Sequence, residues 1–303
     1  MTARPIRRRT AAAGAVLAAV PLLLTGCASG SGGKQSLSLH DQLPEGVRKA
    51  GVLRIGSDLS YAPVESRGAD GRAVGLDPDL AAAVGRKLGV RVEFQNVAFD
   101  KLIPELQAGQ IDLVMSAMTD TKERREGVDE LGNRLNPGVD FIDYFIAGTS
   151  ILTAKGNPHG ITGLNDLCGT TVALQKGTTQ DTIATRQQDP CRAAGKPLKV
   201  MRLGTDDAAL AQLRAGNAVA DMNDFPVAVY NAKKVAGGSA LQVVGPQMQP
   251  APYGIAVNKE NTALRDAVVQ AVDAIIISGE YDKILADWNL SEGAAQNAVV
   301  NGG

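Results

Sequence analysis

The sequence predicts an α/β fold in which two series of short strands and amphipathic helices follow one another along the chain. The first series begins at Val52 and the second at Thr171. Each alternates apolar, strand-like runs with helical patterns, which favours mostly parallel strand pairing. After the second series, the segment 245–250 (Gly-Pro-Gln-Met-Gln-Pro) interrupts the pattern with turn chemistry. We therefore expect two α/β lobes.

The first series contains three strands and two helices. Asp77 and Pro78 offer an N-cap and a first-position proline for a helix with apolar residues every four positions, and Gly89 is expected to end it. The other elements expected here are strands at 52–56, 92–94 and 111–115 and a helix at 100–108 that ends at Gly109.

The second series and the C-terminal part are read in the same way. The expected elements are a strand at 171–174, a helix after Thr178, a strand at 199–203, a helix at 206–215 ended by Gly216, a strand at 219–222, a strand at 253–257, and helices at 263–277 and 281–288. Residues 291–303 lack a clear pattern, and we expect them to form a poorly ordered tail.

The N-terminus has the three parts of a secretory signal. Four arginines precede an apolar run from Ala11 to Leu24, and Leu24-Thr25-Gly26-Cys27 follows. The run is too short to span the ~30 Å hydrocarbon core of a membrane. Its ending resembles a bacterial lipobox, so residues 1–26 are expected to be a lipoprotein signal peptide and Cys27 the lipidated residue. A secreted protein with an incidental cysteine is the alternative. Residues 27–39 are expected to be a flexible tether.

Composition excludes some classes of partner. Removal of residues 1–26 leaves 27 Lys and Arg against 32 Asp and Glu, and no basic patch for nucleic acid is evident. No second apolar segment reaches membrane-spanning length. We expect a monomer without a cofactor, anchored by lipid to the outer face of the cytoplasmic membrane.

Two cysteines remain when Cys27 is assigned to lipid. Cys168 and Cys191 would lie in an oxidising compartment, where a disulfide is expected. A metal pair or a reactive thiol would need neighbouring His or charged partners. His40 and His159 are the only histidines, so a Cys/His metal site is improbable.

Seven segments, in order, carry a resemblance to a known family. They are 54–65, 74–80, 102–118 with Thr119-Asp120-Thr121-Lys122-Glu123-Arg124, 175–180, 220–224, 253–257, and 279–281 with Ile284 and Trp288. The chain resembles the family 3 extracellular solute-binding proteins, the polar amino-acid receptors of ABC importers, and locally their histidine- and lysine/arginine/ornithine-binding members.

The resemblance implies the type II periplasmic-binding-protein fold. Two lobes are joined by two crossing strands, and the ligand lies between the lobes. Transferred to this chain, lobe 1 comprises residues 40–147 plus 249–290, and lobe 2 comprises 152–246. The crossings are expected near 146–151 and 245–250.

The resemblance also implies the groups that hold the ligand's backbone. Arg124 matches the arginine that binds the α-carboxylate, for which a guanidinium suits bidentate pairing. Its alternative is a solvated member of the charged run 122–126. Asp224 matches the carboxylate that holds the α-ammonium. It could also cap the helix that Pro226 begins, and the two roles can coexist.

Other matched positions are expected to line the same site. Ser116, Ala117 and Thr119 would complete the carboxylate cradle, although Ala117 stands where relatives often have Ser or Gly. The free N–H groups of a helix start at Thr178, Thr179 and Gln180 would add to it. The expected side-chain pocket consists of Tyr61, Phe99, Asp58 and Gln175. Asp58 does not settle specificity, and a polar or cationic amino acid is preferred.

One departure and two alternatives remain. The polar stretch 129–138 is an insertion relative to the family; we expect a surface loop, unless it shifts the helix of Arg124. Cyclohexadienyl dehydratases share this fold family, and Asp58 or Glu65 could be proposed as the acid. A sensor that reports to a membrane kinase is the second alternative. We expect a receptor, with permease subunits as its partners, and no enzyme.

Overall fold

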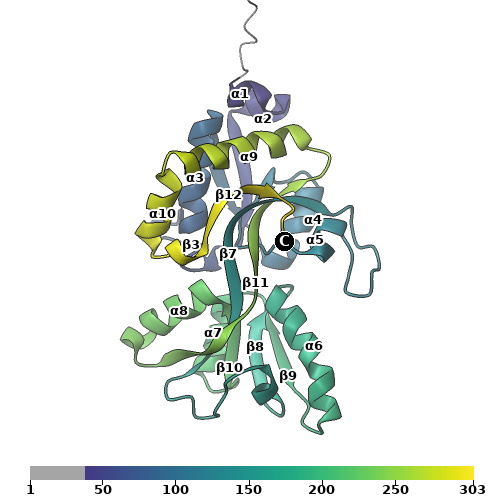
Figure 1. The fold of residues 1–303 in the computed structure, drawn as a ribbon, viewed down its shortest axis with the longest axis vertical. Coiled ribbons are helices and arrows are strands. Elements are labelled where there is room, and N and C mark those ends of the chain that lie inside the picture. Colours follow the sequence, from purple (N-terminus) through teal and green to yellow (C-terminus); the bar gives the residue numbers. More distant parts are fainter. Residues whose placement is uncertain (1–37) are drawn as a thin grey trace, which may run out of the picture. The chain divides into compact units, whose positions relative to one another are not determined.

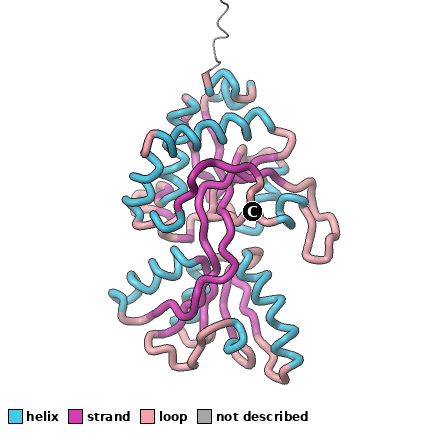
Figure 2. Tube along the Cα trace, in the orientation of Figure 1, coloured by secondary structure: helices cyan, strands magenta, loops and turns pink. Residues whose placement is uncertain are grey.

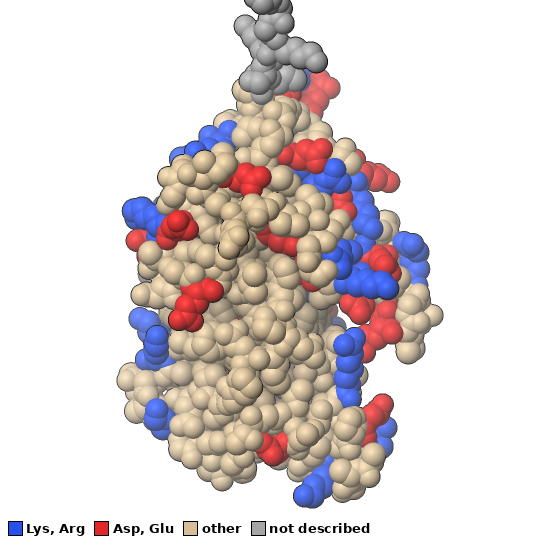
Figure 3. All heavy atoms as spheres, viewed as in Figure 1, with Lys and Arg blue, Asp and Glu red and all other residues tan. Residues whose placement is uncertain are grey.

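The computed structural model describes residues 38–303, and the predicted signal peptide, Cys27 and almost all of the predicted tether lie outside them. Within the described part of the chain, no helix is long and apolar enough to cross a membrane. On the face drawn in Figure 3, basic and acidic side chains are intermixed.

One mixed sheet organises the described chain (Figures 1 and 2). Its order is β5 (Arg91–Asn96), β1 (Val52–Ser57), β6 (Leu113–Val114), β11 (Leu241–Asn258), β7 (Val139–Ala154), β10 (Ala220–Asp224), β8 (Thr171–Gln175) and β9 (Lys199–Leu203). Strand β1 is parallel to β5 and β6, and β8 is parallel to β9 and β10. The long strands β7 and β11 pair antiparallel with each other. They connect the two parallel parts, so the sheet is divided between two lobes.

Lobe 1 is the group of elements around β1, β5 and β6. Its helices are α1 (Leu39–Gln42), α2 (Glu45–Ala50), α3 (Leu76–Leu88), η1 (Phe99–Lys101), α4 (Leu102–Gln107), α5 (Lys122–Glu126), α9 (Thr262–Ile277), α10 (Glu280–Trp288) and η4 (Ser291–Gly293). A small sheet of β2 (Ser60–Tyr61), β3 (Glu65–Arg67) and β4 (Ala73–Val74) belongs to it. Helices α3 and α9 bury Leu80, Leu88, Val268 and Val272 in its core. This apolar burial is the main stabilising contribution.

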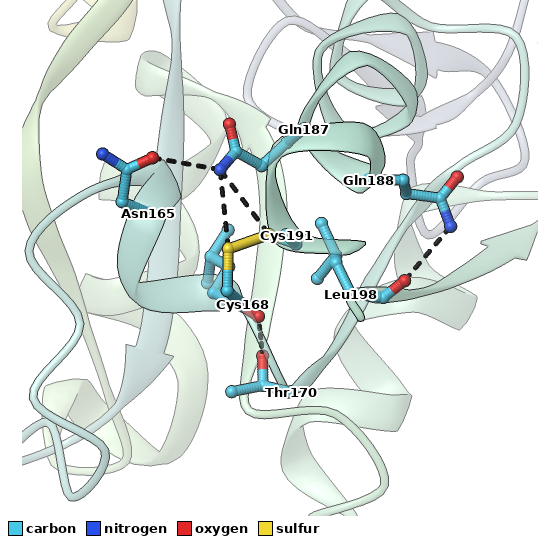
Figure 4. The surroundings of a disulfide bond; sticks show 8 residues. Asn165, Cys168, Thr170, Gln187, Gln188, Cys191 and Leu198 are labelled. Atoms are coloured by element: carbon cyan, nitrogen blue, oxygen red, sulfur yellow. Dashed lines mark hydrogen bonds between the residues drawn. A yellow bond between two sulfur atoms is a disulfide. The ribbon is translucent and has the colours of Figure 1, made fainter. Parts of the chain in front are cut away.

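Lobe 2 is the group around β8, β9 and β10. Its helices are η2 (Leu164–Leu167), α6 (Thr179–Ala193), α7 (Asp206–Arg214), α8 (Phe225–Lys234) and η3 (Val235–Gly238). Val172, Leu174, Ile183 and Met222 form part of its core. The predicted disulfide is confirmed: Cys168, after η2, is bonded to Cys191 in the last turn of α6 (Figure 4).

Most predicted helix ends are confirmed. Gly89 ends α3 in the left-handed conformation that glycine adopts without cost, and the Thr178 hydroxyl caps α6 by accepting a hydrogen bond from Asp181 N. The start of α3 was predicted two residues late. Gly75 is the N-cap, with φ 142°, so Asp77 lies inside the first turn and is fully buried. Pro78 is still tolerated because the first N–H groups of a helix have no intrahelical partner.

The segment 245–250 is not a turn between elements. It lies within β11, which continues from Leu241 to Asn258. The turn-forming residues instead shift the register against β7 between Val244 and Met248 and again before Ala251, with positive φ at Gly245 and Gln249. The turn signal therefore marks an irregular crossing strand.

The prediction of a poorly ordered tail at 291–303 is wrong. After η4, strand β12 (Ala294–Val300) pairs antiparallel with β7, with Ala294 opposite Phe145 and Val300 opposite Ile142. The physical reason is long-range: β10 pairs with β7 only at 149–153, so the first half of β7 has an edge that a weakly patterned segment can complete through backbone hydrogen bonds.

The insertion at 129–138 forms the expected surface loop between α5 and β7. Leu131 and Leu135 are 87% and 67% exposed. Asp129 closes the loop on itself by accepting hydrogen bonds from the backbone N–H groups of Leu131 and Asn133. The five-residue helix α5 forms in front of it, so the insertion leaves the helix of Arg124 intact.

Candidate functional site

A small pocket lies where the two lobes face each other. The residues that line it are Asp58, Tyr61, Glu65, Phe99, Ser116, Ala117, Thr119 and Arg124 from lobe 1, and Gln175, Thr178, Thr179, Gln180 and Asp224 from lobe 2. The structure therefore brings together all twelve positions that the sequence indicates for ligand contact.

Arg124 is held at the pocket by both lobes. One guanidinium nitrogen donates to the carbonyl of Thr119 at 2.8 Å and another to the carbonyl of Gly177 at 3.1 Å, across the cleft. The guanidinium carbon lies 5.3 Å from the centre of the Phe99 ring, a cation–π distance. Burial lowers the pKa of Arg124 to about 10, so it stays charged at neutral pH. Further N–H donors remain for an anionic group.

Asp224 is the N-cap residue of α8, but its side chain does not cap the helix. Its carboxylate instead accepts hydrogen bonds from Gln180 Nε2 at 2.7 Å and from the Tyr61 hydroxyl at 3.1 Å. Burial raises the pKa of Asp224 to about 6, and the hydrogen bonds to its carboxylate oppose this rise. Of the two roles suggested for Asp224, the pocket-lining position is therefore the one its side chain adopts.

Asp58 forms the floor of the site at the end of β1. One carboxylate oxygen accepts from the Ser60 hydroxyl at 2.7 Å, and the other accepts from Gln175 Nε2 at 2.6 Å and from Phe99 N at 3.2 Å. Asp58 is 4% exposed, and a carboxylate so buried needs such donors. Gln175 belongs to β8, so this contact joins the lobes.

A chain of polar groups continues beneath Asp58. Ser116 accepts a hydrogen bond from Asp58 N and donates to Glu65 at 3.0 Å. Ala117 has a positive φ of 45°, and its N–H donates to buried Asp77. Burial, together with neighbouring Asp77, raises the pKa of Glu65 well above its usual range.

Glu65 is the pocket residue that sequence reasoning did not include among the ligand contacts. The motifs indicate it only as an acid for the dehydratase alternative. Its position at the end of the first matched segment, seven residues after Asp58, was the available signal. Recognising its place in the wall requires β3 to fold back against Ser116, which no local pattern encodes.

The start of α6 completes the wall of lobe 2. Thr178 is the N-cap and donates from its hydroxyl to Gln175 O at 2.8 Å, while Thr179 is the first helical residue. A helix N-terminus presents free N–H groups and a partial positive charge. Together with Arg124 it gives the pocket one end suited to an anion. Asp58 and Asp224 give the pocket carboxylates suited to a cation.

Comparisons with known proteins agree with this geometry. Residues 53–291 match the family model described as bacterial extracellular solute-binding proteins, family 3. An arginine-binding protein of Corynebacterium glutamicum is 32% identical over 265 residues, which cover 87% of this chain and 82% of the relative.

Two solved structures extend the likeness. An ancestral arginine-binding protein bound to arginine has a TM-score of 0.70 and 35% identity, over 78% of this chain and 98% of that one. An ancestral amino acid-binding protein described as a precursor of cyclohexadienyl dehydratase has a TM-score of 0.69 and 33% identity, over 80% of this chain and 97% of that one.

Proposed function

Because this chain belongs to the bacterial extracellular solute-binding proteins of family 3, we propose that it captures a free amino acid between its lobes and delivers it to the permease subunits of an ABC importer. The observation that carries the proposal is that Arg124 and Asp224 line the same small pocket. An amino acid brings a carboxylate and an ammonium into the same site, and each buried charge needs a partner.

The two ends of the pocket match the two charges of the ligand's backbone. Arg124 binds the α-carboxylate, with Ser116, Ala117, Thr119 and the start of α6 around it. Asp224 binds the α-ammonium and keeps the acceptor geometry that Tyr61 and Gln180 already fix. This arrangement leaves the opposite wall for the ligand's side chain.

A cationic side chain fits that wall best, and L-arginine is the first candidate. Asp58, Tyr61, Phe99 and Gln175 combine a carboxylate, two aromatic rings and an amide. After Arg124 and Asp224 are matched by the ligand's backbone, Asp58 is still available for a positive group. The arginine-binding relative and the arginine-bound ancestral structure support the same choice.

The test is a calorimetric titration with L-arginine, L-lysine, L-ornithine, L-histidine, L-glutamine and L-glutamate. We expect saturable binding of at least one cationic amino acid and weaker binding of L-glutamate. A parallel thermal-shift screen of the same set should rank the ligands in the same order, because binding to the native state stabilises it by mass action. Silence across the whole set would contradict the proposal.

A dehydratase is the second candidate, and one observation favours it. Glu65 lies in the pocket wall with a pKa well above its usual range, as a general acid requires. A structural relative is also described as a precursor of such an enzyme. Incubation with prephenate or arogenate would decide, since substrate loss that Glu65→Gln abolishes would establish catalysis. We expect no turnover.

The lobes are proposed to move as two bodies, residues 40–147 plus 249–290 against 152–246, with β7 and β11 as the hinge. Small-angle scattering with and without L-arginine should show a smaller radius of gyration in the bound state. We also propose that the protein is a monomer, and size-exclusion chromatography with light scattering tests this.

A lipid on Cys27 is proposed to hold the protein at the outer face of the cytoplasmic membrane. The Leu-Thr-Gly-Cys sequence supports this, although Cys27 lies outside the described residues. Cys27→Ser should release the protein into the medium. Continued retention in the membrane fraction would contradict the lipid anchor on Cys27. The arginine run at 7–9 leaves the export route open.

A further inference from the structure

The last ten residues of the chain form a strap that lies beyond the segment matched by the family model. The strap is residues 294–303, and the family match ends at residue 291. It runs antiparallel along β7, with Val299 opposite Asp143. A glycine is needed at position 293, directly before the strap, because a Cβ there would collide with the Phe145 ring. The sequence pattern assigns no role to this segment.

The strap ends on two buried carboxylates. Gly302 N donates to Asp143 at 2.9 Å, and Gly303 N donates to Asp120 at 3.0 Å. Asp143 and Asp120 are 5% and 2% exposed. Asn301 adds to the same contact: its side chain accepts from Phe141 N and donates to Asp140, and its carbonyl accepts from Arg125 at 2.7 Å. The strap therefore supplies donors that these buried carboxylates need.

Asp120 and Arg125 belong to the segment that also lines the ligand pocket. Asp120 directly follows Thr119, and Arg125 directly follows Arg124. The Arg125 guanidinium pairs with the Asp120 carboxylate at 3.4 Å. Thr119 and Arg124 are in turn linked to each other, because Arg124 donates to the Thr119 carbonyl. The segment 119–125 therefore contacts the strap through Asp120 and Arg125. It contributes Thr119 and Arg124 to the pocket.

The helix between these contacts is too short to hold its own position. Helix α5 has five residues, and an isolated helix of that length is unstable in water because nucleation is costly. Besides its local cap by Thr121, its orientation must come from tertiary contacts such as the hydrogen bond from Arg125 to Asn301 O in the strap. Because the site binds charged groups, a loosely held guanidinium would lose much of its pairing energy.

We propose that the strap positions the carboxylate-binding segment: by holding Asp120 and Arg125 from outside the pocket, residues 301–303 fix Thr119 and Arg124 for the ligand. The proposal rests on the proposed function, since it assumes that Arg124 binds the ligand's carboxylate. Asp120, Arg125 and Asn301 are then positioning residues that act without touching the ligand.

The test removes residues 301–303 from the otherwise complete protein and measures L-arginine binding by calorimetry at 20 °C. We expect affinity to fall by about tenfold or more, because a binding group displaced by a fraction of an ångström loses its geometry. Gln296→Ala, on an exposed position of β12, is the matched control and should bind as the unaltered protein does. Circular dichroism of the free variant should be unchanged.

A second variant covers the case in which the shortened chain fails to fold. Gly303→Ala keeps the chain length, but its Cβ would collide with the Asp120 backbone carbonyl. It should also weaken L-arginine binding. A lower melting temperature with unchanged affinity in both variants would make the strap merely structural and overturn the positioning role. No amino-acid binding by the unaltered protein would instead overturn the proposed function, so the two failures are distinguishable.

Discussion

Gln175 of lobe 2 donates a 2.6 Å hydrogen bond to Asp58 of lobe 1, and the two side chains meet at the floor of the pocket. The contact links closure of the lobes to the state of a buried carboxylate. A cationic ligand group that binds Asp58 would therefore affect the contact between the two lobes. The first prediction tests this relationship.

Asp58→Asn should weaken L-arginine binding by about 10- to 100-fold, since a hydrogen bond to a charged group contributes roughly 1.5–3 kcal/mol. The variant keeps the size of the side chain, removes its charge and replaces one acceptor oxygen by an NH2 donor. Calorimetry measures the effect. Asp100→Asn is the matched control, because Asp100 pairs with Lys176 across the lobes and does not line the pocket. Equal affinity for L-arginine in Asp58→Asn would contradict a role for Asp58 in cation recognition.

Arg124→Ala should reduce amino-acid affinity by at least about 100-fold, because the ligand's buried carboxylate would lose its charged partner. Equilibrium titration at several protein concentrations checks this. Lys122→Ala, on the same helix with a side chain 72% exposed, is the control and should bind normally. If the affinity of Arg124→Ala stays within about tenfold of the unaltered protein, or ~1.4 kcal/mol, Arg124 is not the partner of the ligand's carboxylate.

Ligand affinity should fall as the pH drops below about 6. Burial raises the pKa of Asp224 to about 6, so below that pH the free protein holds a proton on this carboxyl group. The ligand's ammonium favours the ionised carboxylate, so binding below that pH must release the proton and weakens by up to about tenfold per pH unit. Titrations at pH 7.5, 6 and 5 in buffers of different ionisation enthalpy measure both the affinity and the proton count. A flat profile would exclude Asp224 as the ammonium partner.

Asp143→Asn should stabilise the protein at pH 8 and have little effect at pH 4. Burial, with a smaller contribution from neighbouring Asp120, raises the pKa of Asp143 to about 7, while Arg125 and the Gly302 N–H oppose the rise. The folded state keeps a proton that the unfolded chain releases above about pH 4, so the unfolding free energy falls as pH rises from about 4 to about 7. The asparagine removes this contribution.

Urea unfolding of the free protein at pH 4, 6 and 8 measures that change. Asp282→Asn is the control, since Asp282 is exposed on α10. If the difference in unfolding free energy between Asp143→Asn and the unaltered protein is the same at all three pH values, Asp143 does not carry the proton. The strap would then be held without a pH-dependent contribution from Asp143.

Replacement of Cys168 and Cys191 by alanine should lower the unfolding free energy by about 3 kcal/mol, because the disulfide closes a loop across a sequence separation of 23. Denaturant titration shows the loss, and the unaltered protein in excess reductant should approach the same midpoint. Ligand affinity should not change, because the bond lies among η2, α6 and the core of lobe 2. A drop in affinity would instead couple the disulfide to the pocket.

Patterns of neighbouring residues were sufficient to predict many helix ends and caps of this protein. Gly89 and Gly216 follow their helices and Thr178 caps one because caps depend on neighbouring residues alone. The expected oxidising compartment, with few histidines in the chain, indicated a disulfide between Cys168 and Cys191 that the structure confirms. The motif order indicated the fold and twelve residues that the structure places around one pocket. Their binding roles stay predictions.

What the sequence by itself determined, then, is the order and type of the elements expected between residues 52 and 288, because strand and helix periods and caps depend on neighbouring residues. Tertiary structure alone decided that Glu65 joins the pocket wall, that Asp77 is buried under Ala117, and that the register between β11 and β7 shifts around 245–250. It also decided that 294–300 completes the edge of β7. These outcomes depend on backbone partners and buried charges far away in the chain, which no local pattern contains.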